Sequence, residues 1–166
     1  MSRRIGMGFS IAGWMLMLVL LAWLGDSYFR ERNEPNRGLM VGGSGPVVLK
    51  RSRGGHYLAP GLINGKPVRF IVDTGASLVA LSETLAARVG AGKGAEWPMQ
   101  TANGAVIGWR STLDSVQLGA LRQSRVPAVI MPNLDNGEVL LGMSFLRHLE
   151  LIQRGDQLVL QAPAAN

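Results

Sequence analysis

The chain has 166 residues and a formal net charge of +6, and 47% of its residues are hydrophobic. Its lysines and arginines form no dense run and do not alternate with aromatic residues, which argues against a nucleic-acid-binding surface. Cysteine is absent, so disulfides, thiolate catalysis and cysteine-ligated zinc are excluded together. The two histidines, His56 and His148, lack a metal-binding spacing, and we expect neither a metal nor a cofactor.

The N-terminal region contains an uncharged apolar segment over residues 5–24. Its length matches the roughly 20 residues with which a helix spans a bilayer core. A cleaved signal peptide is the alternative, but the apolar region of such a peptide is usually only about 7 to 15 residues long. We therefore predict an uncleaved, single-pass membrane anchor that follows a short cytoplasmic tail over residues 1–4.

The orientation of this anchor is predicted from the charges that flank it. Arg3 and Arg4 precede the apolar segment, and Asp26 is the first charged residue after it. Because positive residues favour the cytoplasmic side of a membrane, the rest of the chain is expected outside. The predicted location is therefore the inner membrane of a bacterium, with the main domain in the periplasm; a cytoplasmic domain is the alternative.

The chain after the anchor divides into a linker and a domain. Residues 25–46 are polar and rich in glycine, asparagine and proline, and they predict a flexible linker. Residues 47–162 contain short runs of valine and isoleucine bounded by glycine, asparagine or proline, which predict a mostly β domain. Residues 163–166 form a tail.

Turns and helices within the domain can be placed from local signals. Asn64-Gly65 predicts a hairpin turn, and further turns are expected at 118–120 and 135–137. Ser82 is a candidate N-cap and Gly90 a candidate end for one helix, with Leu85 and Val89 on one face. A shorter helix is expected at 144–149.

An acidic residue interrupts the apolar stretch FIVDTGASLVALS, residues 70–82. No lysine or arginine lies within three residues of Asp73 to pair with it. A buried carboxylate without a partner is costly, so such a residue is either satisfied by something distant or kept for chemistry. An ordinary Asx-type turn after a strand is the simplest alternative. Thr74 adds a hydroxyl, and Gly75 allows a sharp turn and a close approach of another chain.

Three segments in order resemble the retropepsin-like (retroviral-type) aspartic proteases. FIVDTGAS resembles the active-site segment, and VLLGMSFL at 139–146 resembles the segment that packs beside it. MQTANGAVIG at 99–108 lies between them, where the family has its flap, a hairpin over the substrate. With the N-terminal helix, the chain also resembles the bacterial, membrane-anchored branch of this family. The resemblance implies an all-β, single-lobe fold, a closed barrel with one or two short helices.

The same resemblance implies a reaction and a stoichiometry. An aspartic protease uses two carboxylates that share a proton, but the chain has only one Asp-Thr-Gly. The other aspartates, Asp26, Asp114, Asp135 and Asp156, lie in no comparable setting. We therefore expect a membrane-anchored homodimer that hydrolyses peptide bonds, with one Asp73 from each chain.

The resemblance also assigns roles to neighbouring residues. The catalytic loop would consist of Asp73, Thr74 and Gly75, with the Thr74 hydroxyl bonding across the dimer. The strand predicted at 156–161 would join the sheet at the dimer interface, and an ordinary edge strand is the alternative. The residues that would contact a peptide or protein substrate are Ala76, Ser77, Ala102, Asn103 and Gly104.

The chain departs from retroviral enzymes at Ser77 and Met143, where those enzymes commonly carry an aspartate and an arginine that pair. Both charges are absent together, so no lone buried charge remains. The competing interpretation is a membrane-tethered module of the same fold that dimerises or binds peptides without catalysis. A third is a tethered β domain of unrelated function.

Overall fold

The computed structural model describes residues 14–26, 32–101, 104–132, 134 and 137–163. The chain forms two compact units, Met1–Glu34 and Pro35–Asn166, which are described separately. The second unit begins inside the stretch 25–46 that the sequence predicts to be a linker. The predicted turn at 135–137 lies mostly outside the described residues.

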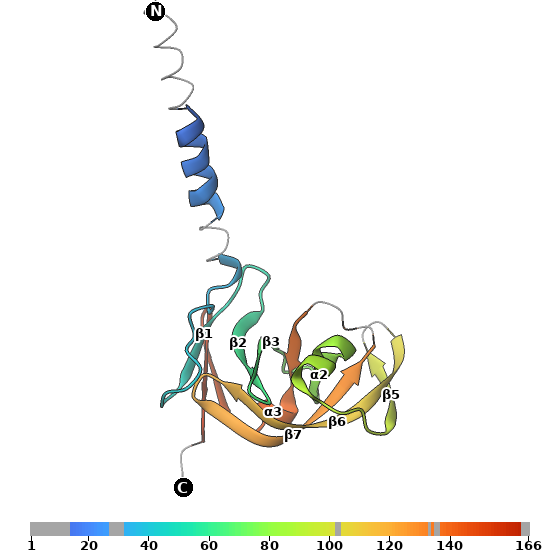
Figure 1. The fold of residues 1–166 in the computed structure, drawn as a ribbon. Helices are drawn as coiled ribbons and strands as arrows, with labels where there is room; N and C mark the ends of the chain where they lie inside the picture. Colours follow the sequence, from blue (N-terminus) through green and yellow to red (C-terminus); the bar gives the residue numbers. More distant parts are fainter. Residues whose placement is uncertain (1–13, 27–31, 102–103, 133, 135–136, 164–166) are drawn as a thin grey trace, which may run out of the picture. The chain divides into compact units, whose positions relative to one another are not determined.

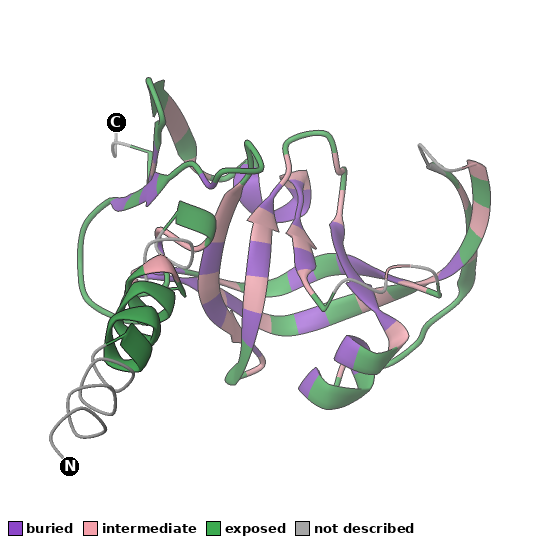
Figure 2. Ribbon diagram, turned by 90° about the horizontal axis from the view of Figure 1, so that it is seen from above, coloured by how far each residue is buried: buried purple, intermediate pink, exposed green. Residues whose placement is uncertain are grey.

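In the first unit, residues 14–26 are helical and their large apolar side chains are exposed (Figure 2). Trp14 and Trp23, for example, are 64% and 65% exposed. Within the described part of the chain, no helix has both the length and the apolar character needed to cross a membrane. Residues 5–13 of the predicted anchor lie outside the described part.

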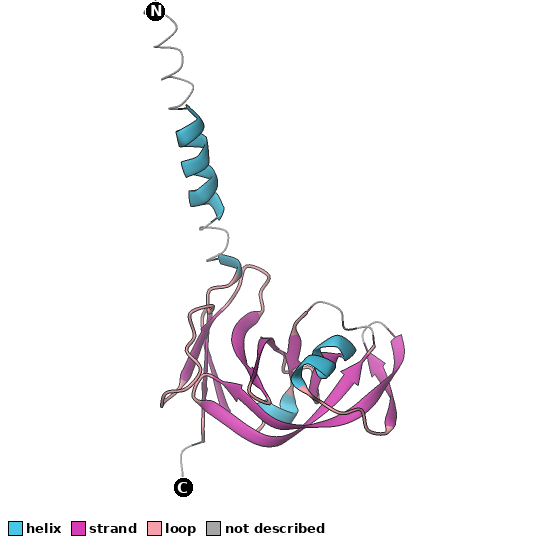
Figure 3. Ribbon diagram, in the orientation of Figure 1, coloured by secondary structure: helices cyan, strands magenta, loops and turns pink. Residues whose placement is uncertain are grey.

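The second unit consists mainly of strands, with two short helices, as the sequence predicts (Figure 3). Its strands are β1 (Val47–Lys50), β2 (Tyr57–Ile63), β3 (Lys66–Val72), β4 (Val79–Ser82), β5 (Glu96–Thr101), β6 (Gly104–Leu118), β7 (Leu121–Met131), β8 (Val139–Leu141), β9 (Glu150–Arg154) and β10 (Gln157–Gln161). Its helices are α2 (Glu83–Val89) and α3 (Met143–Leu146).

The larger sheet closes on itself. Its order is β2-β3-β8-β4-β7-β6-β5, and β2 also pairs with β6 (Figure 1). The barrel therefore consists of β2, β3, β8, β4, β7 and β6, and β5 extends the sheet beyond it. Buried and more exposed residues alternate along β2 and β3, as expected for strands with one face toward a core. Fully buried side chains such as Phe70, Leu81 and Phe145 fill the interior. This arrangement confirms the predicted all-β barrel.

Two of the predicted turns and both predicted helices are observed, although the shorter helix, α3, covers Met143–Leu146 and not 144–149. Asn64 and Gly65 connect β2 to β3 with φ of 51° and 76°, the left-handed conformation that a two-residue hairpin turn needs. Gly119 and Ala120 connect β6 to β7. The Ser82 hydroxyl accepts a hydrogen bond from the Leu85 amide at 3.2 Å, and Gly90 ends α2 with φ of 75°.

A second sheet has three strands in the order β1-β10-β9. Its buried residues Val47, Leu49, Leu158 and Leu160 belong to the same hydrophobic core as the barrel. β10 pairs with β1 on one side and β9 on the other, so the alternative that this segment is an edge strand is wrong. The two edges of this sheet are β1 and β9.

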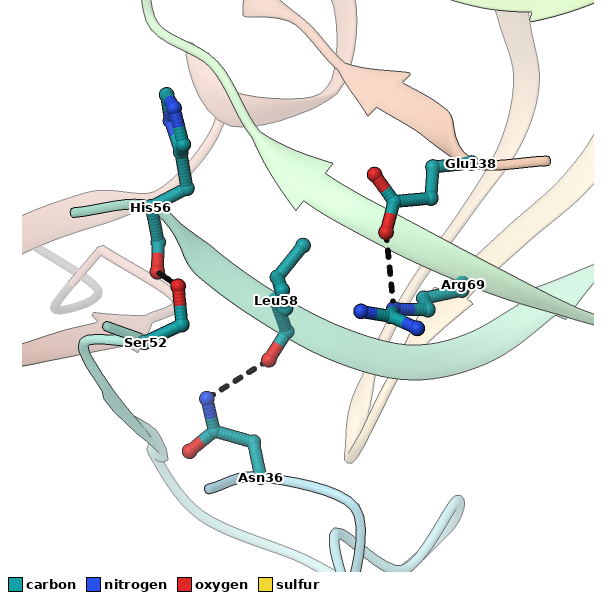
Figure 4. Close-up of polar contacts among 6 residues, drawn as sticks. All are labelled: Asn36, Ser52, His56, Leu58, Arg69 and Glu138. Carbon is teal, nitrogen blue, oxygen red and sulfur yellow. Dashed lines mark hydrogen bonds and ion pairs between the residues drawn. The ribbon is translucent and has the colours of Figure 1, made fainter. Parts of the chain in front are cut away.

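Asn36 ties the two sheets together ahead of β1. Its side-chain Nδ2 donates to the Lys50 carbonyl, at the end of β1, at 2.8 Å and to the Leu58 carbonyl, on β2, at 2.7 Å. Figure 4 shows the bond to Leu58. Its Oδ1 accepts from the Lys50 amide at 2.7 Å. Asn36 is only 7% exposed, so this polar side chain is buried with all of these bonds satisfied. Residues ahead of the predicted domain start at 47 therefore contribute to the domain.

Candidate active site

Asp73 lies directly after β3, at a point where two strands far apart in the sequence run side by side. β3 and β8 are parallel, with Phe70 opposite Val139 and Val72 opposite Leu141. The Asp73 amide continues this pairing by donating to the Leu141 carbonyl at 3.2 Å. An ion pair between Arg69 and Glu138, at 3.1 Å, joins the same strands (Figure 4).

The loop after Asp73 is held by the start of α3. The amides of Met143 and Ser144 donate to the carbonyls of Ala76 and Ser77, at 2.7 and 3.0 Å. The Ser144 hydroxyl accepts from the Val79 amide at 3.0 Å and donates to the Pro127 carbonyl at 2.8 Å. The segment 139–146 therefore packs beside the Asp73 loop, as the resemblance implies.

Gly142 is required for this close packing. A Cβ atom at this position would lie 2.2 Å from the Leu78 carbonyl oxygen and 2.6 Å from that of Ala76. Both neighbours are backbone atoms, which cannot move aside as the end of a flexible side chain can. The glycine thus allows the loop 73–78 to lie directly against the chain that leads into α3.

The Asp73 carboxylate is half-buried and is positioned by its own loop. Its Oδ1 accepts a hydrogen bond from the Gly75 amide at 2.9 Å, which leaves Oδ2 available to another partner. Within the described residues, Asp73 makes no ion pair. Thr74 and Gly75 are exposed, and the Thr74 hydroxyl has no hydrogen bond in the described part of the chain.

The comparisons with known proteins agree with this geometry. A model of the gag-polyprotein putative aspartyl protease family matches residues 59–148, which include Asp73 and Gly142. The chain belongs to this aspartyl protease family. A curated relative, an uncharacterized protein in the cobV 5' region of Sinorhizobium sp., is 30% identical over 176 residues, which cover 96% of this chain and 76% of the relative.

Two solved structures are also similar. The crystal structure of a retropepsin-like aspartic protease from Rickettsia conorii is 30% identical, with a TM-score of 0.59 over 70% of this chain and 89% of that one. EIAV protease in complex with the inhibitor HBY-793 is 18% identical, with a TM-score of 0.45 over 55% of this chain and 86% of that one. The family model and the Rickettsia conorii structure confirm the retropepsin-like family inferred from the sequence, and the membrane-anchored branch of that family stays a prediction.

β5 and β6 form a hairpin at the place in the sequence where the resemblance implies the flap. The strands pair from Glu96 opposite Trp109 to Thr101 opposite Gly104. Gly104 opens β6 with φ of 107°, a conformation that residues other than glycine rarely adopt. The predicted contact residues Ala102 and Asn103 lie outside the described residues. Ala76 is half-buried and Ser77 is exposed, both in the loop after Asp73.

Other residues near Asp73 were not singled out from the sequence. A pocket of about 390 Å³ is lined by Asp73 and Thr74 together with His56, Tyr57 and Gln153, from the β1–β2 loop, β2 and β9. No local motif marks these residues, because long-range strand pairing brings them to Asp73. Among the described residues, no three histidines, aspartates or glutamates cluster as a metal site would require.

Proposed function

We propose that the chain is an aspartic endopeptidase that acts as a homodimer, with one Asp73 from each copy. The observation that carries the proposal is the Asp73 loop. Backbone hydrogen bonds to β8 and α3 hold this loop, while Oδ2 of the carboxylate and the Thr74 hydroxyl are available to a second copy. A two-fold axis beside this loop would supply the second carboxylate. A C2 interface uses the same surface on both copies, so one such loop per chain is sufficient.

The mechanism follows from the proximity of two carboxylates. Like charges so close cannot both ionise, so the pair holds one shared proton. The ionised carboxylate activates a water molecule, and the protonated one polarises the carbonyl of the scissile bond. The Gly75 amide, which donates to Asp73 Oδ1 at 2.9 Å, keeps the carboxylate oriented in each copy.

The substrate would be an extended peptide or protein segment that lies between the Asp73 loop and the β5–β6 hairpin. Such a segment can be held largely by main-chain hydrogen bonds, as an added strand is. Ala76, Ser77, Ala102, Asn103 and Gly104 are the proposed contact residues, and Thr74 is proposed to bond across the dimer. No metal or cofactor is needed for this reaction.

Two surfaces of the small sheet are available to the second copy. β10 is paired on both sides, so a partner strand can add only at β1 or β9. β9 carries Leu151 and Gln153, which line the pocket beside Asp73. An interface along β9 would therefore place the partner next to the catalytic loop.

The membrane anchor over residues 5–24 remains part of the proposal, with the protease domain in the periplasm. Its support is the uncharged apolar sequence. Two domains confined to one membrane meet at a raised effective concentration, which would favour a weak dimer. Extraction of the full chain from bacterial membranes by alkaline carbonate alone would contradict the anchor.

Exchange of the carboxylate tests the catalytic proposal. The full chain should cleave members of a diverse peptide library, and Asp73→Asn should lose this cleavage by at least about 1000-fold, since the dyad can no longer share its proton. Asp114→Asn, an exposed aspartate on β6, is the matched control and should retain wild-type cleavage. Equal cleavage by wild type and Asp73→Asn would refute the mechanism.

A mixing experiment tests the stoichiometry. If each site needs two Asp73 residues, an excess of Asp73→Asn chains captures wild-type chains in inactive heterodimers and suppresses their activity. If each chain acts alone, activity stays proportional to the wild-type chain present. If neither the wild-type chain nor any variant cleaves peptides, and the chain dimerises when peptide is added, the alternative of a non-catalytic binding module is favoured.

A further inference from the structure

A second, larger pocket of about 530 Å³ lies at the base of the β5–β6 hairpin. Its walls come from Leu78, from the loop 92–94 and from residues of β5, β6 and β7. Leu78 follows Asp73 by five residues, or no more than about 17 Å of extended chain. A peptide held at Asp73 under the hairpin therefore reaches this pocket with a side chain a few residues from the scissile bond.

The pocket has a cationic wall. Trp97, Arg110 and Thr112 all line it, from β5 and β6. The Arg110 guanidinium carbon lies 4.4 Å from the centroid of the Trp97 ring, so the cation stacks on the aromatic face. Stacking uses the face of the guanidinium and leaves the N–H groups at its edge able to donate.

Arg110 differs from the other cation at this pocket. Lys93 is already in an ion pair with Glu83 and lies 3.6 Å from the centroid of the Trp109 ring. Arg110 has no carboxylate partner among the described residues. The pocket therefore offers a planar, uncompensated pair of donors, which suits a carboxylate.

The backbone around Arg110 is fixed, so the cation is held at the pocket. The Arg110 carbonyl accepts from the Gly94 amide at 2.8 Å, and the Arg110 amide donates to the Ala95 carbonyl at 2.9 Å. The Ser111 hydroxyl donates to the Gly92 carbonyl at 2.7 Å. These bonds join the 92–95 loop to β6 and make a defined wall.

We propose that this pocket is a substrate subsite that selects an acidic side chain, with Arg110 as the residue that determines the preference. The inference rests on the proposed peptidase function and adds the class of substrate: extended peptides with glutamate or aspartate a few residues from the cleaved bond. Leu78 and Trp97 would contact the apolar part of that side chain, and Arg110 its carboxylate.

Cleavage specificity gives the first test. The full chain is incubated with a randomised octapeptide library with amidated C-termini, so that side chains supply the only carboxylates. Mass spectrometry should show glutamate and aspartate enriched about three- to tenfold at one position, because a partly exposed ion pair gives an effect of this size. Arg110→Gln should remove the enrichment, and Arg110→Lys should keep part of it.

Arg122→Gln is the matched control, since Arg122 is exposed on β7 and does not line the pocket. It should leave the enrichment unchanged. The enrichment should also weaken as salt is raised, because exposed charges are screened. Cleavage that depends on Asp73 but shows no acidic preference would overturn the subsite and leave the peptidase function standing.

Binding gives a test that does not need turnover. Immobilised full chain carrying Asp73→Asn is offered two amidated octapeptide libraries that differ only in a fixed glutamate or glutamine. Stronger retention of the glutamate library, lost in Asp73→Asn/Arg110→Gln, supports the subsite even where no cleavage is seen. Equal retention overturns it. Stronger retention of peptides with a free C-terminal carboxylate than of the glutamate library would also overturn it, since the pocket would then bind chain ends.

Discussion

The closed barrel and the three-stranded sheet of the domain share one core but differ in whether their outer strands are paired on both sides. In the barrel, β3 and β8 beside Asp73 are each paired on both sides, and the pairing of β2 with β6 closes the ring. In the small sheet, β1 and β9 each keep an unpaired edge. Unpaired edges are where other strands add.

This difference separates two requirements of the proposed enzyme. The proposed catalytic loop must be rigid; it follows a strand that is paired on both sides, and backbone hydrogen bonds from α3 hold it. A second copy must be able to add, and the small sheet provides edges for this. The attachment of the small sheet to the barrel then determines how firmly the partner is positioned.

The largest expected loss of stability comes from a side chain added at Gly142, beside the Asp73 loop. Gly142→Ala places a Cβ 2.2 Å from the Leu78 carbonyl oxygen, and the barrel must move to relieve the clash. We expect the free energy of unfolding to fall by about 3 kcal/mol or more, as for severe overpacking, measured by urea denaturation. Gly38→Ala is the control, since a Cβ there meets nothing within 4 Å. Equal stability of the two variants would contradict the packing.

A smaller loss is expected where the two sheets are joined. Asn36→Ala removes three hydrogen bonds to β1 and β2 and leaves part-buried backbone groups of Lys50 and Leu58 without these partners. The expected cost is about 2 to 3 kcal/mol, measured by thermal denaturation. Exposed Asn33 offers the control, and Asn33→Ala should be neutral. A chain that starts at residue 47 should also melt below one that starts at 35; identical melting temperatures would argue against a role for Asn36.

The smallest expected loss lies within the barrel itself. Ser144→Ala removes the buried hydroxyl that joins the Val79 amide to the Pro127 carbonyl. Because two hydrogen bonds are lost here, against three at Asn36, the cost should be about 1 to 2 kcal/mol in urea denaturation. Ser124→Ala, at an exposed position on β7, should change stability little. A loss at Ser124 as large as at Ser144 would show that the hydroxyl bridge is unimportant.

Local signals in the sequence were sufficient for several elements. Asn64-Gly65 predicted the β2–β3 turn because few residues adopt a positive φ, and the observed angles agree. Ser82 and Gly90 predicted the ends of α2 because they satisfy helix-end groups. The order of the DTGAS and LLGMSFL segments predicted the family, and the family model confirms it.

Other features depend on partners that are distant in the sequence. Asn36 lies in a segment whose composition predicts a flexible linker, yet it bonds to Lys50 and Leu58. The central place of β10 follows from pairing with β1, more than a hundred residues earlier, so its own residues could not distinguish it from an edge strand. The dimer, the dyad and the anchor stay predictions.

The sequence by itself singled out Asp73 as the candidate for the chemistry, because an Asp-Thr-Gly after an apolar strand is a local pattern. It also determined that one chain holds only one such segment. Only the tertiary structure placed Arg110 on Trp97 beside Leu78, three residues from separate parts of the chain. The physical reason is that strand pairing and register decide which side chains share a pocket, and no single segment encodes its partners.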